Sequence, residues 1–170
     1  MKDRLIVADS CCDLTEEMKS KLDIELVPLT LQLDDVDYLD DENLDVDKYI
    51  EAMRNASSIK TAAPSPKLFM DKFEEAKEVF CVTLSGKLSA TYSNACLAKT
   101  MVLEKGERLI HVFDTKSAAS GETLVALKIQ ECIDKKSSFA IEILLCSDEN
   151  YSNWKIPKYI KEGLEWLKED

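Results

Sequence analysis

The chain has 170 residues, of which 45% are hydrophobic and 32% charged, as is typical of one globular domain and not of a disordered chain. Its 33 acidic and 22 basic side chains give a net charge of −11, which argues against binding to a nucleic-acid backbone. No run approaches the roughly 20 apolar residues of a membrane span, and a strand-like run follows Met1 to Arg4 directly, so we expect a soluble cytoplasmic protein without a signal peptide.

The first elements alternate apolar runs with amphipathic stretches, a pattern that favours a mostly parallel sheet covered by helices. A strand, a helix and a second strand are expected over residues 5–8, 15–22 and 24–33. Asp13 and Glu16 have the spacing of a capping box at the start of the helix. Pro28 cannot donate a ladder hydrogen bond, so the second strand should lie at a sheet edge or contain a break.

An acidic segment follows, with eight acids and no base between Asp34 and Asp47. It lacks the glycine and glutamate that an EF-hand loop needs at its sixth and twelfth positions, so we interpret it as a solvated loop without calcium. After it, four apolar residues at helical spacing predict a helix with Asp45 as its cap. These residues are Val46, Tyr49, Ile50 and Met53.

The next stretch, residues 55–63, is small and polar and predicts a loop. Ser65 followed by Pro66 is typical of a helix start. The buried face of this helix is expected to comprise Leu68, Phe69, Phe73 and Ala76. Residues 79–84 show no polar alternation, which indicates a strand covered on both sides. A helix, a strand and a long helix are then expected over residues 90–103, 109–113 and 119–134.

The end of the chain differs in pattern. Residues 139–145 predict a helix or a strand, and residues 147–153 form a polar break. Apolar residues then recur at helical spacing between Ile156 and Leu167, which predicts an amphipathic C-terminal helix. The whole pattern predicts an α/β fold of three layers, α/β/α.

The cysteines and the single histidine give no metal signal, because no C-x-x-C pair occurs and one histidine cannot complete a common zinc set. Three of the six cysteines lie in apolar runs and are expected in the core: Cys81, Cys132 and Cys146. Cys11 and Cys12 fall in a predicted loop, where a structural role is favoured over a reactive one. His111 lies in the middle of a predicted strand and is interpreted as structural.

Three strands are followed by turns rich in hydroxyl groups, at Asp9 and Ser10, at residues 85–89 and at residues 114–117. Such turns meet at the carboxyl edge of a parallel sheet, where helix N-termini favour anionic ligands such as a carboxylate or a phosphate. The sequence contains no complete P-loop, no G-x-G-x-x-G and no G-x-S-x-G motif. It therefore predicts a binding site without a chemical step, a cofactor or a metal.

Several of these segments resemble the DegV family. Residues 5–14 and 27–30 resemble its first two strands, and residues 60–66, 84–92 and 114–121 are similar to its T-S-Q-P-S, S-S-K-L-S-G-T-Y and D-S-K-S-A-S-x-G segments. The order and spacing of these motifs match the family from residue 5 to about residue 138. The chain is thus identified as a member of the DegV family over the family's N-terminal half.

The resemblance implies a bacterial fatty-acid-binding protein that encloses an acyl chain and presents its carboxylate to a separate fatty acid kinase. Carried onto this chain, the carboxylate-holding hydroxyls are those of Thr61 and Ser89. Supporting pocket loops are expected to contribute Asp9, Ser10, Ser85, Leu88, Thr91 and Ser117. The chain departs from the family motifs at Ala62, Ala63, Gly86 and Ala90.

The resemblance also implies a division into a DegV-like α/β domain over residues 1–138 and a divergent tail over residues 139–170, packed on the same domain. Family members continue instead with a second half that closes the lipid pocket. Two functions are therefore weighed: a lipid-binding carrier, and a ligand-free shortened module that associates with itself or with a full-length relative. An enzyme is the least favoured hypothesis, since no pair of nucleophile and base is recognised.

Overall fold

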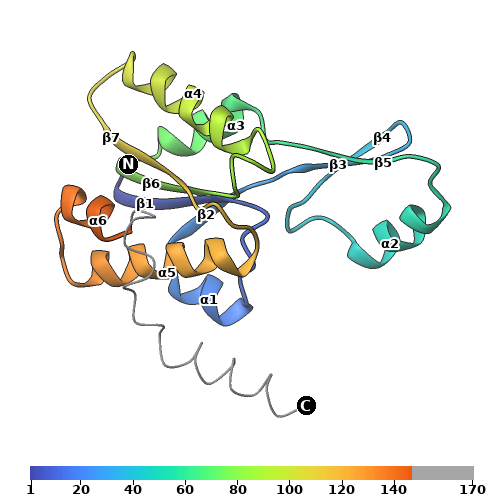
Figure 1. Cartoon of the computed structure of the whole chain (residues 1–170), viewed down its shortest axis with the longest axis horizontal. Coiled ribbons are helices and arrows are strands. Elements are labelled where there is room, and N and C mark those ends of the chain that lie inside the picture. Colours follow the sequence, from blue (N-terminus) through green and yellow to red (C-terminus); the bar gives the residue numbers. More distant parts are fainter. Residues whose placement is uncertain (147–170) are drawn as a thin grey trace, which may run out of the picture.

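The computed structural model describes residues 1–146, apart from the side chains of residues 141, 142, 144 and 145. Its centre is a four-stranded sheet with the spatial order β2-β1-β6-β7 (Figure 1). The strands are β1 (Lys2–Asp9), β2 (Ile24–Val27), β6 (Ala76–Thr83) and β7 (Leu109–Asp114). All three neighbouring pairs are parallel, so the carboxyl ends of the strands lie along one edge.

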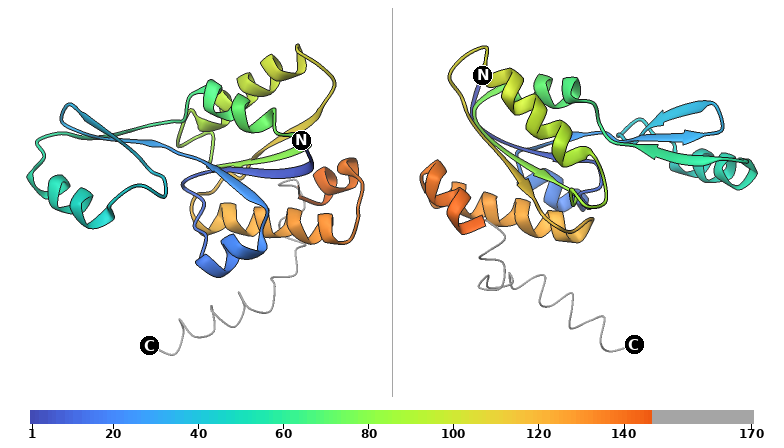
Figure 2. Two further views of the ribbon diagram at one scale, coloured as in Figure 1. Left: turned by 180° about the vertical axis from the view of Figure 1, so that it is seen from behind. Right: turned by 45° about the horizontal axis from the view of Figure 1, so that its top comes forward.

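Helices cover both faces of this sheet, as Figures 1 and 2 show. One layer holds α3 (Pro66–Phe73) and α4 (Thr91–Leu103), and the other α5 (Ser120–Asp134) and α6 (Phe139–Cys146), with α1 (Glu16–Lys21) beside α5. Since successive strand side chains point to opposite faces, β6 sends Val79 and Cys81 into one core and Phe80 and Val82 into the other. The predicted three-layer α/β fold is confirmed.

A second, antiparallel sheet extends away from this body (Figures 1 and 2). Its strands are β3 (Thr30–Leu33), β4 (Val36–Leu39) and β5 (Ile59–Ala62), in the order β4-β3-β5, and α2 (Val46–Asn55) connects β4 to β5. We call residues 30–62 the projecting unit. The prediction of a loop over residues 55–63 was wrong, because this stretch contains the strand β5. Every residue of β5 is exposed, so its sequence lacks the alternation of apolar and polar residues that indicates a strand.

The structure also tests the predictions for the strand around Pro28, for the acidic segment and for the helix after it. The strand predicted over residues 24–33 is broken at Pro28, as expected. The part before the break, β2, is the edge strand of the parallel sheet, and the part after it, β3, pairs with β4 and β5 in the other sheet. The acidic segment is not only a loop, since it contains β4. The predicted helix cap is confirmed, as the Asp45 carboxylate accepts the Lys48 N–H at 3.1 Å.

Two details of helix starts and faces were wrong. The N-cap of α1 is Thr15 and not Asp13, because the Thr15 hydroxyl accepts the Met18 N–H at 3.2 Å. On α3, which begins at Pro66 as predicted, Met70 is buried while Leu68 remains 36% exposed. The helix is turned so that Leu68 faces solvent at the margin of the apolar stripe.

The segment predicted as helix or strand after residue 138 is the helix α6. Its Phe139 ring lies 4.7 Å from the Phe80 ring, so α6 packs on the central sheet. The polar break and the amphipathic helix predicted beyond it lie outside the described residues, and the domain boundary at residue 138 stays a prediction. Within the described part of the chain, no helix has the length and apolar character needed to cross a membrane.

The cysteines predicted to lie in the core do so: Cys81, Cys132 and Cys146 are at most 2% exposed. Cys12 is also buried, and burial raises its pKa to about 12. Burial raises the pKa of Cys11 as well, which opposes thiolate formation and favours the structural role for this pair. The His111 ring packs edge-on against Phe113 at 4.4 Å, in agreement with a structural histidine.

Candidate functional site

The turns that follow β1, β6 and β7 are joined to one another at the carboxyl edge of the parallel sheet. The Asp9 carboxylate accepts the Leu84 N–H at 2.8 Å, which ties the end of β1 to the turn after β6. The Ser85 N–H donates to the Ser117 carbonyl at 2.8 Å, and the Thr115 hydroxyl donates to the Thr83 carbonyl at the same distance. The predicted convergence of these three turns is therefore observed.

Ser89 lies at the start of α4. The Ser85 carbonyl accepts the N–H groups of Leu88 and Ser89 at 2.8 and 3.1 Å, which closes a tight turn before the helix. The Ser89 hydroxyl oxygen lies 2.9 Å from that of Thr91 and accepts the Thr91 N–H at 3.3 Å. Two hydroxyl groups thus meet at a helix N-terminus, where free N–H groups and the helix dipole favour an anion. Thr91 is fully buried, so the half-buried Ser89 is the hydroxyl of this pair that a ligand can reach.

Thr61 lies in β5 of the projecting unit, opposite Leu31, and is exposed. The chain returns from there to the body: the Asn94 side-chain amide donates to the Pro64 carbonyl at 2.9 Å. This bond fixes a residue three positions after Thr61 to the first turns of α4. Thr61 therefore lies in the antiparallel sheet, while Ser89 lies in the turn between β6 and α4 at the edge of the parallel sheet, and the chain connects the two places at this point.

Two of the other predicted site residues, Ser10 and Ser85, hold the turns in place through hydrogen bonds within the protein. The Ser10 hydroxyl donates to the Asp40 carboxylate at 2.7 Å and accepts the Leu29 N–H at 3.0 Å, which ties the turn after β1 to the acidic segment. Ser85 accepts the Lys87 N–H at 3.2 Å. Leu88 is 70% exposed, so it does not line a closed pocket in this chain.

Sequence reasoning missed Glu122, which is fully buried beside Asp9. Neither of its carboxylate oxygens has a hydrogen-bond partner in the described part of the chain. Burial, and then the neighbouring charge of Asp9, raise the pKa of Glu122 to about 9. The only sequence signal was an acid in the first turn of a helix, which ordinarily indicates an exposed residue near the dipole.

Asp9, Cys11 and Glu122 could in principle hold a cation, since one ligand atom of each lies within 4.8 Å of the others. Both Asp9 oxygens already accept backbone N–H groups, from Cys11 at 3.0 Å and from Leu84 at 2.8 Å. A neutral Glu122 side chain is also a weak metal ligand, because metals bind the ionised form. We therefore assign the trio to the framework of the site.

Asp114 was also missed as a site residue, although its motif had been noted. Its carboxylate accepts the N–H groups of Gly86 and Lys116, both at 3.0 Å, and so holds the turns after β6 and β7 together. A nearby residue, Gly121, is required by close packing, because a Cβ atom there would lie 2.0 Å from the Ser117 hydroxyl.

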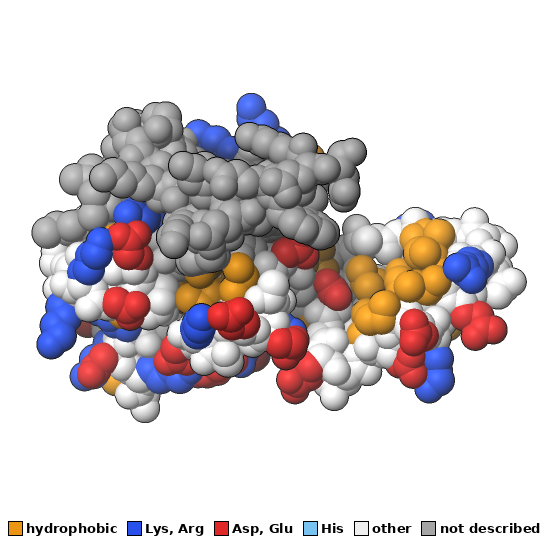
Figure 3. Space-filling view, turned by 90° about the horizontal axis from the view of Figure 1, so that it is seen from below, with side chains coloured by type: hydrophobic (Ala, Val, Ile, Leu, Met, Phe, Trp, Pro, Cys, Tyr) orange, Lys and Arg blue, Asp and Glu red, His pale blue; other side chains and the backbone are white. Residues whose placement is uncertain are grey.

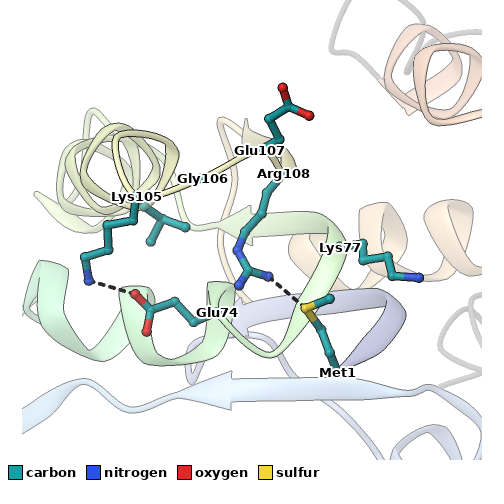
Figure 4. A pocket seen from close by; sticks show the side chains of 8 residues that line it. Met1, Glu74, Lys77, Lys105, Gly106, Glu107 and Arg108 are labelled. Atoms are coloured by element: carbon teal, nitrogen blue, oxygen red, sulfur yellow. Dashed lines mark hydrogen bonds and ion pairs between the residues drawn. The ribbon is translucent and has the colours of Figure 1, made fainter.

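Cavities lie near both ends of the parallel strands. One, of about 350 Å³, lies at the amino ends of the strands (Figure 4), where Lys105 pairs with Glu74 at 2.8 Å and Arg108 donates to the Ala76 carbonyl at 2.6 Å. It is remote from the hydroxyl-rich turns. A larger one, of about 610 Å³, lies beside Ser10, Leu26 and Asp40 on the carboxyl side of β2.

A family model described as "Uncharacterised protein, DegV family" matches residues 4–154. A DegV domain-containing protein of Streptococcus pneumoniae is 38% identical over 138 residues, which are 79% of this chain and 49% of that protein. A DegV domain-containing protein of Streptococcus pyogenes is 36% identical over the same shares of both chains. The chain thus spans about half the length of the curated relatives it matches.

Solved structures show the same fold. A DegV family protein from Ruminococcus gnavus, solved with vaccenic acid, is 36% identical with a TM-score of 0.80; the match covers 84% of this chain and 52% of that one. The Streptococcus pneumoniae Fatty Acid Kinase B3 protein, loaded with linoleic acid, is 33% identical with a TM-score of 0.76, over 85% and 53% of the two chains.

Proposed function

This chain belongs to the DegV family, and from that premise we propose that it binds a long-chain fatty acid or a similar amphipathic acid. The hydroxyls of Thr61 and Ser89 hold the carboxylate. The observation that carries the proposal is the pair of hydroxyl groups, Ser89 and Thr91, 2.9 Å apart at the N-terminus of α4 and at the carboxyl edge of the sheet.

The chemistry of this place suits an ionised carboxylate. Hydroxyl and backbone N–H donors make charge-assisted hydrogen bonds to it, which are roughly twice as strong as neutral ones. The Ser89 oxygen already accepts the Thr91 N–H, so its own proton is available to the ligand or to Thr91. An anion at this point is favoured further by the dipole of α4, which has 13 residues.

The projecting unit supplies apolar surface next to Thr61. Leu31 lies directly opposite Thr61, and Tyr38 lies opposite Leu31, so the three side chains share one face of the antiparallel sheet. An acyl chain that contacts such surface gains about 0.8 kcal/mol for each CH₂ removed from water. Affinity then comes mainly from the acyl chain, and orientation from the hydroxyls.

The relatives support the ligand class, because two solved structures at 36% and 33% identity hold vaccenic and linoleic acid. The second of these is a B3 protein of a fatty acid kinase, and by analogy this chain presents its acid to a kinase subunit. On this proposal the chain is a cytoplasmic carrier without a catalytic site of its own, and the partner supplies the phosphoryl transfer.

The test is lipid extraction followed by retention assays. The 170-residue chain is purified from a bacterial host and extracted for mass spectrometry, and oleate retention is then measured for Thr61→Ala with Ser89→Ala. We expect a stoichiometric fatty acid and a loss of at least tenfold in oleate affinity. Thr100→Ala, an exposed threonine on the same helix α4, is the control. Unchanged oleate binding by a folded double variant overturns the assignment of the two hydroxyls, and the absence of any bound acid overturns the function.

A further inference from the structure

Two turns at the carboxyl edge of the parallel sheet are joined through a single oxygen atom. The Asp114 Oδ1 atom accepts the N–H groups of Gly86 and Lys116, both at 3.0 Å. Gly86 packs closely against this carboxylate, since a Cβ atom there would lie 3.2 Å from the other Asp114 oxygen. Lys116 has a left-handed backbone with a φ of 52°, which is uncommon outside glycine. The shared oxygen therefore holds Lys116 and Lys87, the residue after Gly86, on adjoining turns.

The two lysines give this edge a local positive charge. Residues 84–92 and 114–121 contain Lys87, Lys116 and a single acid, Asp114. The rest of the molecule differs, because the whole chain has a net charge of −11 and Figure 3 shows acidic side chains on both the body and the projecting unit. A locally basic place on an acidic protein attracts an anion where the remaining surface repels it.

Lys87 is available to pair with a ligand. It is exposed, and among the described residues no acceptor lies within hydrogen-bond or ion-pair distance of its ammonium group. Its backbone is fixed, because its N–H donates to the Ser85 hydroxyl at 3.2 Å. At the opposite, amino ends of the strands, Lys77 and Lys105 each pair with a carboxylate at 2.8 Å. The charge of Lys87 is therefore not neutralised in this way, and it lies two residues before Ser89.

The charge of the bound head group changes in the phosphoryl transfer that the proposed function assigns to the partner, and the present inference rests on that function. A carboxylate oxygen of the acid bonds to the terminal phosphorus of a nucleoside triphosphate, and the bond to the leaving nucleoside diphosphate breaks, with no proton exchanged. The head group then carries about two negative charges in place of one, since a phosphate monoester has a second pKa of about 6. Hydroxyl groups alone bring no positive charge to meet this increase.

We propose that Lys87 and Lys116 bind the phosphoryl group of the acyl phosphate, next to the Ser89 hydroxyl that holds the carboxyl end. Ammonium groups make charge-assisted hydrogen bonds to phosphate oxygens. The Ser117 carbonyl accepts the Ser85 N–H at 2.8 Å, which is a second bond between the two turns that carry the lysines. The lysine pair thus distinguishes the phosphorylated acid from the free acid, and the carrier retains the product more tightly than the substrate.

The experiment compares two ligands with the same number of carbon atoms, palmitate and hexadecylphosphonate, a stable substitute for the phosphorylated acid. Lys87→Ala with Lys116→Ala should weaken hexadecylphosphonate binding by about tenfold or more and palmitate binding by less than about threefold. Lys87→Arg with Lys116→Arg keeps both positive charges and should retain most of the phosphonate affinity. Lys77→Ala with Lys105→Ala removes the same charge from the amino ends of the strands and should change neither affinity.

Circular dichroism establishes that the variants are folded, and Lys87→Ala alone, at an exposed position, provides a second test with a smaller loss of phosphonate affinity. The inference is overturned if the alanine variants bind hexadecylphosphonate as tightly as the native chain, or if both ligands are weakened equally. Palmitate binding by the native chain without phosphonate binding would contradict this inference and leave the proposed function intact. Phosphonate binding that depends on the two lysines, without palmitate binding, would do the reverse.

Discussion

The carboxyl groups of Asp9 and Glu122 meet inside the carboxyl edge of the parallel sheet, with oxygen atoms within 4.8 Å of each other. Both residues are fully buried. Two ionised carboxylates at this distance repel each other strongly, so one of them keeps a proton. Asp9 accepts two backbone N–H groups, and burial and the charge of Asp9 raise the pKa of Glu122, so Glu122 is the protonated member at neutral pH.

Replacing Glu122 by glutamine should therefore stabilise the protein at neutral and alkaline pH. The folded-state pKa of about 9 lies above the ordinary glutamate value of 4.5, so the folded protein binds more protons than the unfolded chain between these values. Stability contributed by the protonated group is complete below pH 4.5 and is lost as the pH rises toward 9. We expect Glu122→Gln to be more stable than the native chain by about 1–3 kcal/mol at pH 8.

Urea unfolding at pH 5, 6.5 and 8 measures this difference, with Glu107→Gln as an exposed control. The advantage of Glu122→Gln should grow with pH, while the control should show none. A difference that is constant with pH would mean that Glu122 is ionised in the folded protein.

A second prediction concerns the stability of the Gly121→Ala variant, at the same carboxyl edge of the parallel sheet. Alanine ordinarily stabilises a helix by about 1 kcal/mol relative to glycine. At this position, however, the added Cβ would lie 2.0 Å from the Ser117 hydroxyl and 2.6 Å from the Ser117 Cβ. We expect Gly121→Ala to destabilise the protein by about 1–3 kcal/mol through overpacking. Gly106→Ala, with open space around it, should be neutral.

Thermal unfolding compares the two alanine variants. Ser117→Gly removes both atoms that the new Cβ would meet, so adding it to Gly121→Ala should recover most of the lost stability. Failure of this rescue would show that the cost has another origin.

The three-layer body was predictable because its elements carry strong local signals. The uninterrupted apolar run of β6 and the Ser65–Pro66 helix start identify elements that lie where the sequence placed them. Motif spacing also located Ser89 and Thr91, whose hydroxyls do meet. These signals are local, and the parallel sheet then brings its turns together by topology alone.

The strands β4 and β5 of the projecting unit and the burial of Glu122 could not be predicted, because they depend on distant partners. β5 is short and exposed, and only its pairing with β3 makes it a strand. Glu122 is buried because α5 packs against the turn after β1, which no pattern within α5 indicates. A contact between segments more than a hundred residues apart leaves no mark in either segment of a single sequence.

Asp34 gives a third prediction, on the projecting unit. It has a positive φ of 51° in the turn between β3 and β4, and its carboxylate accepts the N–H groups of Ser57 and Ser58 at 3.0 and 2.8 Å. Asp34→Ala removes both bonds and places an unfavourable residue in the left-handed region, so we expect a local loss of about 1–3 kcal/mol. Asp34→Asn keeps the acceptor and tolerates this backbone conformation, and should retain most of the stability.

Amide hydrogen exchange of β3 and β5 measures this loss where it occurs, since the projecting unit can open without unfolding the body. Asp35→Ala, in the same turn, is the matched control. Equal exchange in the Asp34→Ala variant and the native chain would show that the turn does not depend on the carboxylate.

His111 determines how stability changes on the acid side. Burial, with a smaller contribution from the charge of Lys99, lowers the pKa of His111 from 6.5 to about 4. Between pH 6.5 and 4 the unfolded chain therefore binds a proton at His111 that the folded protein does not bind. The free energy of unfolding decreases as the pH falls through this range. The ring is partly exposed, so solvent screening reduces this loss to about 1–2 kcal/mol.

Replacement by leucine removes the titration and keeps an apolar side chain against Phe113. The His111→Leu variant should lose less stability than the native chain between pH 6.5 and 4.5, by the same 1–2 kcal/mol, about the amount that holding the ring neutral costs. Titration of the His111 ring by NMR provides an independent measurement, because the native protein should keep the ring neutral at pH 5.5. A ring that is half protonated near pH 6.5 in the folded protein would contradict both expectations, since it would place His111 in solvent and not against Phe113.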